Sequence, residues 1–441
     1  MIDLKELARL LGKDCDSKLI NKFCHDSRNI KAEDVYIALK GQRVDGHDYV
    51  LEAERAGAIA VIVERLVKDI NIPQFVVKSS LHAWQKIARF IREKSSARVI
   101  GITGSCGKTT VKSLLGHVLS SIQPTLVTSG NFNNEIGVPL TLSGLQRKHR
   151  YAVIEMGARK KGDICVLCQC VQPDIGLITC SSEVHLESFG NITEVIKTKG
   201  ELFQTMKKGV AIYPKSDRGN KVWTKYSSHL KTFQSSLENP YRLEMMGYDN
   251  HTMKVRVLDE KGCEHTFDSQ LLGRHSLHNL SLVLAVTAEL GIMLVDVIKA
   301  FKSYTPEASR QRLYTLEKIS LIDDSYNASP ASVKAAMQTL KDVSDLPVFI
   351  LGDMAELGEH SSESHKDIAS YARSLDICLY YVGEYRDEVR MGYGSDSGIY
   401  SKYTDLIENL VFSGNELVWV KGSRKSKMER VVNYLRERYS C

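Results

Sequence analysis

The stretch best suited to chemistry is residues 101–110, Gly-Ile-Thr-Gly-Ser-Cys-Gly-Lys-Thr-Thr. Apolar residues precede it, and apolar residues at helical spacing follow it, which predicts a strand, a glycine-rich turn and a helix. Such a turn can hold phosphate, because glycine lets backbone N–H groups approach an anion and the helix N-terminus adds partial positive charge. Lys108 would reach the terminal phosphates, and the Thr109 hydroxyl would bind Mg²⁺. The usual Walker spacing would place glycine where Ile102 stands, so a chance Gly-Lys-Thr in a plain turn is the alternative.

Three residues further along could add ligands to such a site. Glu155 ends an apolar strand, and ligands bind at the carboxyl ends of strands in parallel sheets. His185 follows the next strand; alone, it could equally be a hydrogen-bonded polar residue. Lys199 falls on the apolar face of a predicted helix at 192–207, where burial would lower its pKa and leave a nucleophilic neutral amine. It would then need a partner or a chemical modification, unless its side chain extends to water.

Two polar regions could contact a ligand. Residues 128–139 are dense in Asn and Gly, a composition that suits a ligand with many hydroxyls and carbonyls but also an ordinary surface loop. Ser27, Arg28 and His47 lie in predicted turns beside strands, where ligand contacts gather. The alternative is local capping by Asp26, with Arg28 in solvent.

The elements that must position these residues predict an α/β protein with parallel sheets. A chain of 441 residues is long enough for two or three domains. Two polar stretches between predicted elements indicate domain boundaries, which predicts domains at 1–94, 95–306 and 307–441. Strands and helices alternate in the third domain, but it has no second phosphate loop, so we expect it to close over ligands held by the second.

Composition narrows the classes of function. The net charge of +6 is spread along the chain without a basic tract, so we expect no nucleic-acid partner. No apolar run approaches about 20 residues, so no membrane span is expected. The first residues show no signal-peptide pattern, which indicates a cytoplasmic protein with its ten cysteines as free thiols. Cys165, Cys168 and Cys170 lack the further ligands that a zinc site needs.

Several of these stretches resemble the Mur ligase family of peptidoglycan synthesis. They are the phosphate loop, Asp26-Ser27-Arg28 and Asp45-Gly46-His47. Residues 130–139, 323–330 and 351–358 resemble the member of that family that joins D-alanyl-D-alanine to UDP-MurNAc-tripeptide. The resemblance implies a small UDP-binding domain, a central P-loop ATPase domain and a C-terminal Rossmann-like domain. It also implies amide-bond formation through an acyl phosphate, with ATP and Mg²⁺, by a monomer.

The resemblance further implies roles for single residues. The catalytic residues would be Lys108, Lys199 (carbamylated), His185 and Arg312. ATP would contact Gly104, Ser105, Cys106, Gly107, Lys108, Thr109, Thr110, Asn279, Arg312, Asp324 and Asn327. The metal ligands would be Thr109, Glu155, His185 and Lys199. The UDP-sugar substrate would contact Ser27, Arg28, His47, Asn133 and Asn134.

The chain departs from the family's pattern at three places. Ser276 follows His275 where Asn is usual, Cys180-Ser181-Ser182 replaces Asn-Ile-Gly, and Cys106 replaces a common Asn. One alternative is the family member that adds the third amino acid, which usually carries an Asp-Tyr-Ala-His-type motif where this chain has residues 324–327, Asp-Ser-Tyr-Asn. Folylpolyglutamate synthetase shares the phosphate loop but should lack the Asp-Ser-Arg turn. The last alternative is a non-catalytic nucleotide-binding homologue, which would not need a buried lysine.

Overall fold

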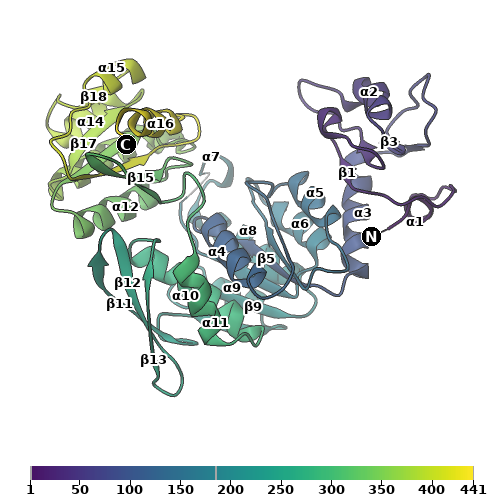
Figure 1. Ribbon diagram of the computed structural model, residues 1–441, viewed down its shortest axis with the longest axis horizontal. Coiled ribbons are helices and arrows are strands. Elements are labelled where there is room, and N and C mark those ends of the chain that lie inside the picture. The colour runs from purple at the N-terminus through teal and green to yellow at the C-terminus, as the bar shows by residue number, and fades with distance from the viewer. Residues whose placement is uncertain (1, 184–185, 441) are drawn as a thin grey trace.

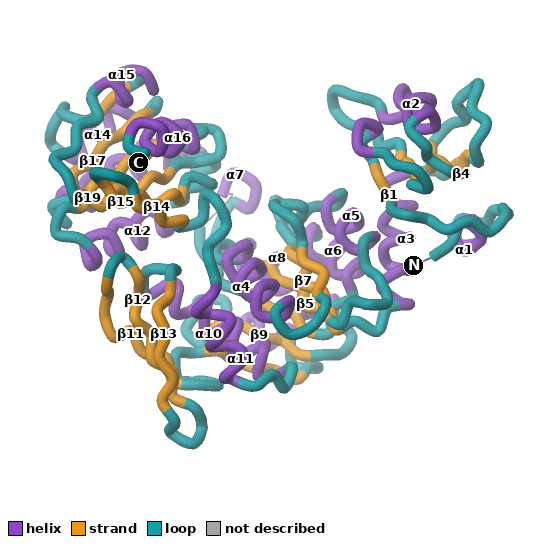
Figure 2. Tube along the Cα trace, in the orientation of Figure 1, coloured by secondary structure: helices purple, strands orange, loops and turns teal. Residues whose placement is uncertain are grey.

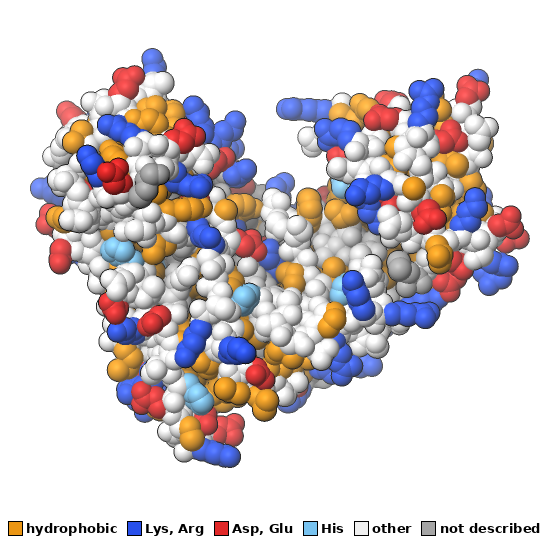
Figure 3. Space-filling view, viewed as in Figure 1, with side chains coloured by type: hydrophobic (Ala, Val, Ile, Leu, Met, Phe, Trp, Pro, Cys, Tyr) orange, Lys and Arg blue, Asp and Glu red, His pale blue; other side chains and the backbone are white. Residues whose placement is uncertain are grey.

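The protein consists of three lobes that follow one another along the chain (Figure 1). The computed structural model describes residues 2–183 and 186–440. In these residues the strands form a four-stranded, a three-stranded and two six-stranded sheets. The N-terminal and C-terminal lobes stand on either side of the central lobe, and the surface is deeply notched between them (Figure 3). The tube view shows that each lobe combines helices with strands (Figure 2).

The N-terminal lobe is built on a parallel sheet in the order β1-β2-β3-β4. Its middle strands are wholly buried, as their apolar sequences predict. The opening helix starts at a capping box in which Asp3 and Glu6 satisfy each other's backbone N–H groups. The elements are α1 Leu4–Leu10, β1 Phe23–Cys24, β2 Val35–Ile37, α2 Val50–Arg55, β3 Ala60–Val63 and β4 Gln74–Val76, with short 3₁₀ turns at Ser27–Asn29 and Gly46–Tyr49.

Helix α3, Ser80–Lys94, joins the first lobe to the second. It packs against α5 and α6 of the central lobe. Trp84 is fully buried, and its indole N–H donates to Ser143 Oγ at 2.9 Å. Arg92 donates to the carbonyl of Gln172 and to the carboxylate of Asp174 at 2.9 Å. The helix is therefore anchored in the central lobe at both of its ends.

The central lobe is a six-stranded parallel sheet in the order β10-β9-β8-β5-β7-β6. Helices α4, α10 and α11 share one apolar core with it, and α5, α6 and α8 share another core with α3. This is a three-layer arrangement, with helices on both faces of the sheet. The elements are β5 Arg98–Thr103, α4 Lys108–Ser120, β6 Thr125–Val127, α5 Gly137–Ser143, β7 Tyr151–Glu155, α6 Asp163–Val171, β8 Ile175–Ile178, α7 Leu186–Phe189, α8 Ile192–Thr205, β9 Val210–Pro214, α9 Asn220–Tyr226, β10 Lys231–Ser235, α10 Arg274–Glu289 and α11 Leu294–Ser303.

Residues 210–270 contribute strands to two sheets, and β9 and β10 extend the parallel sheet. Strands β11 Arg242–Asp249, β12 Thr252–Leu258 and β13 Glu264–Ser269 form a separate antiparallel sheet. Helix α10 begins at Arg274, after Gly273 with φ of +87°, so His275 and Asn279 lie on its first turns rather than before the helix.

The C-terminal lobe has a six-stranded sheet in the order β14-β15-β19-β16-β17-β18. Five strands are parallel, as predicted, whereas β14 pairs antiparallel with β15 at the edge. The elements are β14 Arg312–Thr315, β15 Ile319–Asp324, α12 Pro330–Val343, β16 Pro347–Gly352, α13 Ser361–Ser374, β17 Cys378–Val382, α14 Arg386–Tyr393, β18 Ile399–Tyr400, α15 Tyr403–Glu408, β19 Glu416–Lys421 and α16 Glu429–Arg438, with a 3₁₀ turn at Gly358–His360.

The predicted α/β class with three parallel-sheet domains is confirmed. The boundaries at 94/95 and 306/307 stay predictions. Across residues 2–183 and 186–440, none of the helices is long and apolar enough to cross a membrane. Cys165, Cys168 and Cys170 lie on α6, where the last two are buried and donate to backbone carbonyls.

Candidate active site

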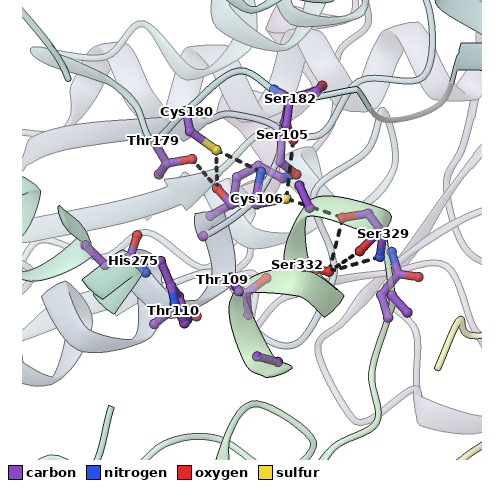
Figure 4. Close-up of a pocket in the computed structure, with 18 of the residues that line it drawn as sticks. Ser105, Cys106, Thr109, Thr110, Thr179, Cys180, Ser182, His275, Ser329 and Ser332 are labelled. Atoms are coloured by element: carbon purple, nitrogen blue, oxygen red, sulfur yellow. Dashed lines mark hydrogen bonds between the residues drawn. The ribbon is translucent and has the colours of Figure 1, made fainter. Parts of the chain in front are cut away.

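A cavity of about 510 Å³ lies between the central and C-terminal lobes. The phosphate-loop side of the cavity comes from the carboxyl ends of β5, β7 and β8 and from the first turns of α4 and α10. The linker after α11 and the ends of β15 and β19 close it from the C-terminal lobe. In Figure 4, Thr179 and Cys180 approach Cys106 from one side, while Ser329 and Ser332 face the loop from α12. The third domain therefore covers the phosphate loop, as we expected.

The phosphate loop requires its glycines. Gly104 has φ of +147°, and an added Cβ would lie 2.0 Å from Thr179 Oγ1. Gly107 has φ of +79°, and an added Cβ would lie 2.7 Å from the side-chain oxygen of Asn279. The loop leads directly into α4, whose first residue is Lys108. The Lys108 amine donates to the carbonyls of Gly104 at 2.7 Å and Ser105 at 3.1 Å, so it lies over the loop where phosphate would bind.

Glu155 is the centre of a buried polar cluster at the end of β7. One of its oxygens accepts from Thr109 Oγ1 at 3.4 Å and from Asn133 Nδ2 at 2.8 Å. The other oxygen, Oε2, is buried, and within residues 2–183 and 186–440 it has no hydrogen-bond partner. Lys112 lies on α4 with its amine 3.8 Å from Oε2, and it also donates to the Gly130 carbonyl at 3.0 Å. An unpartnered buried carboxylate oxygen beside a threonine hydroxyl is a suitable environment for a hard cation.

Lys199 is fully buried on α8, which confirms that it faces inward. Burial, together with the positive charge of Lys108, lowers the pKa of its amine to about 7. Its Nζ lies 5.7 Å from the centre of the Phe189 ring. Within the described part of the chain, no carboxylate is close enough to form an ion pair with it. A large share of the amine, about half, is thus neutral at pH 7 and available for chemistry.

His185 lies outside the described residues, so its position relative to Glu155 and Thr109 stays a prediction. The neighbouring Ser182 and Glu183 do line the cavity.

The C-terminal lobe contributes one arginine that the sequence did not single out. Arg310 Nη2 donates to Thr109 Oγ1 at 3.3 Å, and its guanidinium lies 3.8 Å above the Tyr326 ring. Arg312, which the resemblance implies, does not line the cavity; its Nη1 donates to the Pro306 carbonyl at 3.0 Å. The two arginines stand two residues apart, Arg310 in the linker and Arg312 at the start of β14, and spacing alone could not decide between them.

The remaining predicted nucleotide contacts meet at this cavity. Asn327 and Asp324 line it, and Asp324 accepts from the Lys421 amine at 2.6 Å. His275 pairs with the Gln311 side chain at 2.8 Å, and burial lowers the pKa of His275 to about 4, so its ring is neutral. Lys421 and Gln311 are further lining residues that sequence reasoning missed. The predicted residues that line the cavity are Ser105, Cys106, Gly107, Lys108, Thr109, Thr110, Asn133, Glu155, Asn279, Asp324 and Asn327.

Most of the residues predicted to contact a UDP-sugar do not line the cavity, although Asn133 does. Ser27, Arg28 and His47 lie in the N-terminal lobe, and none of them lines the cavity. Both ring nitrogens of His47 are engaged, with Asp45 Oδ1 at 2.6 Å and with the Glu64 N–H at 2.8 Å. The Arg28 side chain is 82% exposed beside Asp26. Asn134 accepts from the Gly137 N–H at 2.8 Å and so caps α5, whereas its neighbour Asn133 reaches Glu155.

Known proteins resemble this chain along its whole length. Family models match residues 20–94 as "Mur ligase family, catalytic domain", 102–287 as "Mur ligase middle domain" and 310–435 as "Mur ligase, glutamate ligase domain". A UDP-N-acetylmuramoyl-tripeptide–D-alanyl-D-alanine ligase of Haemophilus influenzae is 32% identical, over 98% of this chain and 97% of its own length.

Two solved structures share the arrangement of the lobes. MurF from Acinetobacter baumannii is 28% identical with a TM-score of 0.89, over 98% of each chain. MurF ligase from Thermotoga maritima, solved in complex with ADP, is 28% identical with a TM-score of 0.82, over 94% of this chain and 97% of its own. With a phosphate loop and a buried carboxylate at one cavity, a buried lysine in the same lobe, and relatives that match from end to end, the chain belongs to the Mur ligase family.

Proposed function

We propose that this protein joins D-alanyl-D-alanine to UDP-MurNAc-tripeptide in peptidoglycan synthesis, converting ATP to ADP and phosphate. As a member of its family it is an ATP-dependent ligase. The choice of substrates is supported by the Haemophilus influenzae relative, which is named as a UDP-N-acetylmuramoyl-tripeptide–D-alanyl-D-alanine ligase. One structural observation carries the proposal: the phosphate loop, Glu155 and the C-terminal lobe enclose a single cavity.

In the proposed reaction the chain acts mainly by positioning and charge. The loop N–H groups and Lys108 hold the phosphates of ATP while the tripeptide carboxylate attacks the γ-phosphorus, giving an acyl phosphate and ADP. The amine of D-alanyl-D-alanine then attacks the acyl carbon, and the tetrahedral intermediate collapses to the amide and phosphate. Arg310 and Lys421, contributed from the C-terminal side, add positive charge to the cavity in which the phosphoryl group transfers.

The donor set of the cavity fits Mg²⁺. Thr109 and Glu155 supply oxygen atoms, and Glu155 Oε2 has no other hydrogen-bond partner. When bound there, the ion would neutralise phosphate charge. The amine of Lys112, a residue of α4, forms an ion pair with the same carboxylate and holds it in place.

Lys199 would add a further metal ligand to the oxygen atoms of Thr109 and Glu155. A neutral, buried amine adds CO₂ and releases a proton, which gives a carbamate with anionic oxygens. Such oxygens are hard ligands of the type that Mg²⁺ prefers. We therefore propose that Lys199 acts as a carbamate together with Glu155 and His185.

The proposal is tested by measuring phosphate release with ATP, Mg²⁺, UDP-MurNAc-tripeptide and D-alanyl-D-alanine, omitting each component in turn. We expect release to require both acceptor substrates and the product to be heavier by one dipeptide unit. Release with UDP-MurNAc-dipeptide and a free diamino acid would instead identify the ligase of the third residue. ATP binding without release on any acceptor would identify a non-catalytic homologue.

The location and the assembly state belong to the same proposal. A reaction that consumes ATP and a UDP-linked precursor belongs in the cytoplasm. We propose a monomer, because one chain supplies both sides of the cavity. Light scattering at the concentration used for the activity assay tests this.

A further inference from the structure

Cys106 and Cys180, two residues at which the chain departs from the family's sequence pattern, lie in contact. Cys106 lies in the phosphate loop, and Cys180 follows β8, seventy-four residues later in the chain. The Cys106 N–H donates to Cys180 Sγ at 3.3 Å, and the Cys180 thiol donates to the Cys106 carbonyl at 3.4 Å. The Ser105 N–H donates to the Cys180 carbonyl at 2.9 Å, which fixes the two backbones side by side. Figure 4 shows Cys180 Sγ directed at Cys106.

Hydroxyl groups from two lobes surround the Cys106 sulfur. It lies 3.6 Å from Ser182 Oγ and 3.9 Å from Ser329 Oγ. Ser329 belongs to the C-terminal lobe, so the thiol sits where the two lobes meet. Both cysteines line the cavity and are partly exposed. Both residues therefore face the space that a small reagent would enter.

The surroundings of Cys106 favour its thiolate form. Contact with the Cys180 thiol is the largest cause that lowers the pKa of Cys106, and hydrogen bonds from Ser182 and the charge of Lys108 add to it. The same contact raises the pKa of Cys180. Elsewhere in the chain burial has the opposite effect, since it raises the pKa of both Cys168 and Cys170 to about 12. Cys106 is thus the nucleophile of the pair and Cys180 its proton-bearing neighbour.

We propose that Cys106 and Cys180 form a thiol–disulfide exchange site for low-molecular-weight disulfides, and that the internal disulfide formed there prevents nucleotide binding. The inference about binding rests on the proposed function, whereas the exchange chemistry does not. In the first step the Cys106 thiolate attacks one sulfur of a disulfide RSSR, and RS⁻ leaves and takes up a proton. In the second step Cys180 loses its proton and attacks the Cys106 sulfur, which expels the second RS⁻. Two protein thiols are oxidised, and one RSSR becomes two RSH.

The internal disulfide would act on the phosphate loop itself. It would tie residue 106 to the end of β8 and would restrict the loop that carries the N–H groups facing phosphate. The restricted loop should lose hydrogen bonds from these N–H groups to the anion, and this loss should weaken nucleotide binding by more than about tenfold. Bound ATP should in turn shield Cys106 from the disulfide, since both occupy the same cavity.

Glutathione disulfide is the probe, and peptide mapping by mass spectrometry is the first readout. We expect a linkage between Cys106 and Cys180 in the wild-type protein and much slower reaction when MgATP is present. The Cys180→Ser variant should stop at a mixed disulfide on Cys106, because no second thiol is available. Cys263 is exposed, lies outside the cavity and serves as the matched control, so Cys263→Ser should form the same internal linkage.

The second readout is direct binding of a fluorescent ATP analogue before and after oxidation. Loss of binding that a dithiol reductant restores supports the proposal. Modification of Cys263 with Cys106 left untouched would overturn the exchange site. A Cys106–Cys180 linkage with unchanged nucleotide affinity would overturn the inhibitory role. Failure of the ligase reaction itself alters neither measurement, so the two proposals fail separately.

Discussion

At the scale of single residues, the site is defined by groups whose ordinary partners are missing. Glu155 Oε2 has no hydrogen-bond donor, and Lys199 has no carboxylate within the described residues. Buried polar groups are usually satisfied, because leaving them unpaired costs free energy. Here both groups lie in the lobe that carries the phosphate loop, and the Lys112 amine is the ionic partner of Glu155. The proposed mechanism would supply the missing partners as a bound cation and a carbamate.

Lys199→Ala should nearly abolish turnover. The substitution removes the amine that would form the carbamate, so high bicarbonate should not restore the rate. Phosphate release at saturating substrates measures this. Lys197→Ala is the matched control, because Lys197 lies on the same helix, is exposed and pairs with Glu194. Substantial remaining activity in the Lys199 variant would remove this residue from the mechanism.

Lys199 should also leave a signature in the pH dependence of stability. Its folded-state pKa of about 7 lies below the ordinary value of 10.5, so between these values the unfolded chain holds a proton that the folded chain has lost. The free energy of unfolding should therefore rise with pH across this window, by up to about 1.4 kcal/mol per pH unit relative to Lys199→Met. Below pH 7 both states are protonated and the difference stays constant. Urea unfolding in CO₂-free buffer tests this, and a flat difference between pH 7 and 9 would contradict it.

At the scale of elements, α4 does more than present the phosphate loop. Lys112 lies on α4 four residues after Lys108 and is fully buried. Its amine contacts Glu155 at the end of β7, the Gly130 carbonyl, and Glu307 of the linker at 3.6 Å. One side chain thus joins the loop helix, the Asn-rich loop and the connection to the third lobe. The position of α4 determines where the carboxylate of Glu155 can lie.

Lys112→Met should destabilise the protein by about 3–5 kcal/mol, because it leaves the buried Glu155 carboxylate without a compensating charge. Unfolding in urea measures the change. The double variant Lys112→Met/Glu155→Gln should recover much of the loss, since it removes the unpaired charge as well. If the double variant were as unstable as the single one, the pairing of these residues would not be the cause.

The sequence predicted the part of the site that lies at strand ends. Lys108, Thr109 and Glu155 follow buried strands, and a parallel sheet brings such ends to one edge. Arg310 was missed because a linker has no periodicity from which the direction of a side chain can be inferred. His47 stays a predicted substrate contact; both its nitrogens bond within its own lobe, and local spacing could not reveal the Glu64 N–H seventeen residues away.

At the scale of the whole molecule, the structure shows the third lobe placed over the second. Arg310 reaches Thr109, and Ser329 faces Cys106, so groups from after α11 complete a cavity that begins at the phosphate loop. Since both lobes line the cavity, we expect turnover to depend on their approach. The N-terminal lobe contributes none of the residues that line it.

Arg310→Ala should lower kcat/KM for ATP by about tenfold or more, because it removes a charged contact between the linker and the phosphate loop. Initial rates at varied ATP measure the effect. Arg430 stacks on Tyr403 much as Arg310 stacks on Tyr326 but lies outside the cavity, so Arg430→Ala is the matched control. Equal rates for the two variants would show that Arg310 does not act on the nucleotide.

Helix α3 has a consequence for how such enzymes diversify. It connects the first lobe to the rest, yet Trp84 and Arg92 bind it into the central lobe. The N-terminal lobe is thus attached through a helix whose side chains pack against the central lobe. Because α3 packs on the central lobe, the N-terminal lobe can change in sequence or be exchanged in evolution without altering the cavity at the phosphate loop.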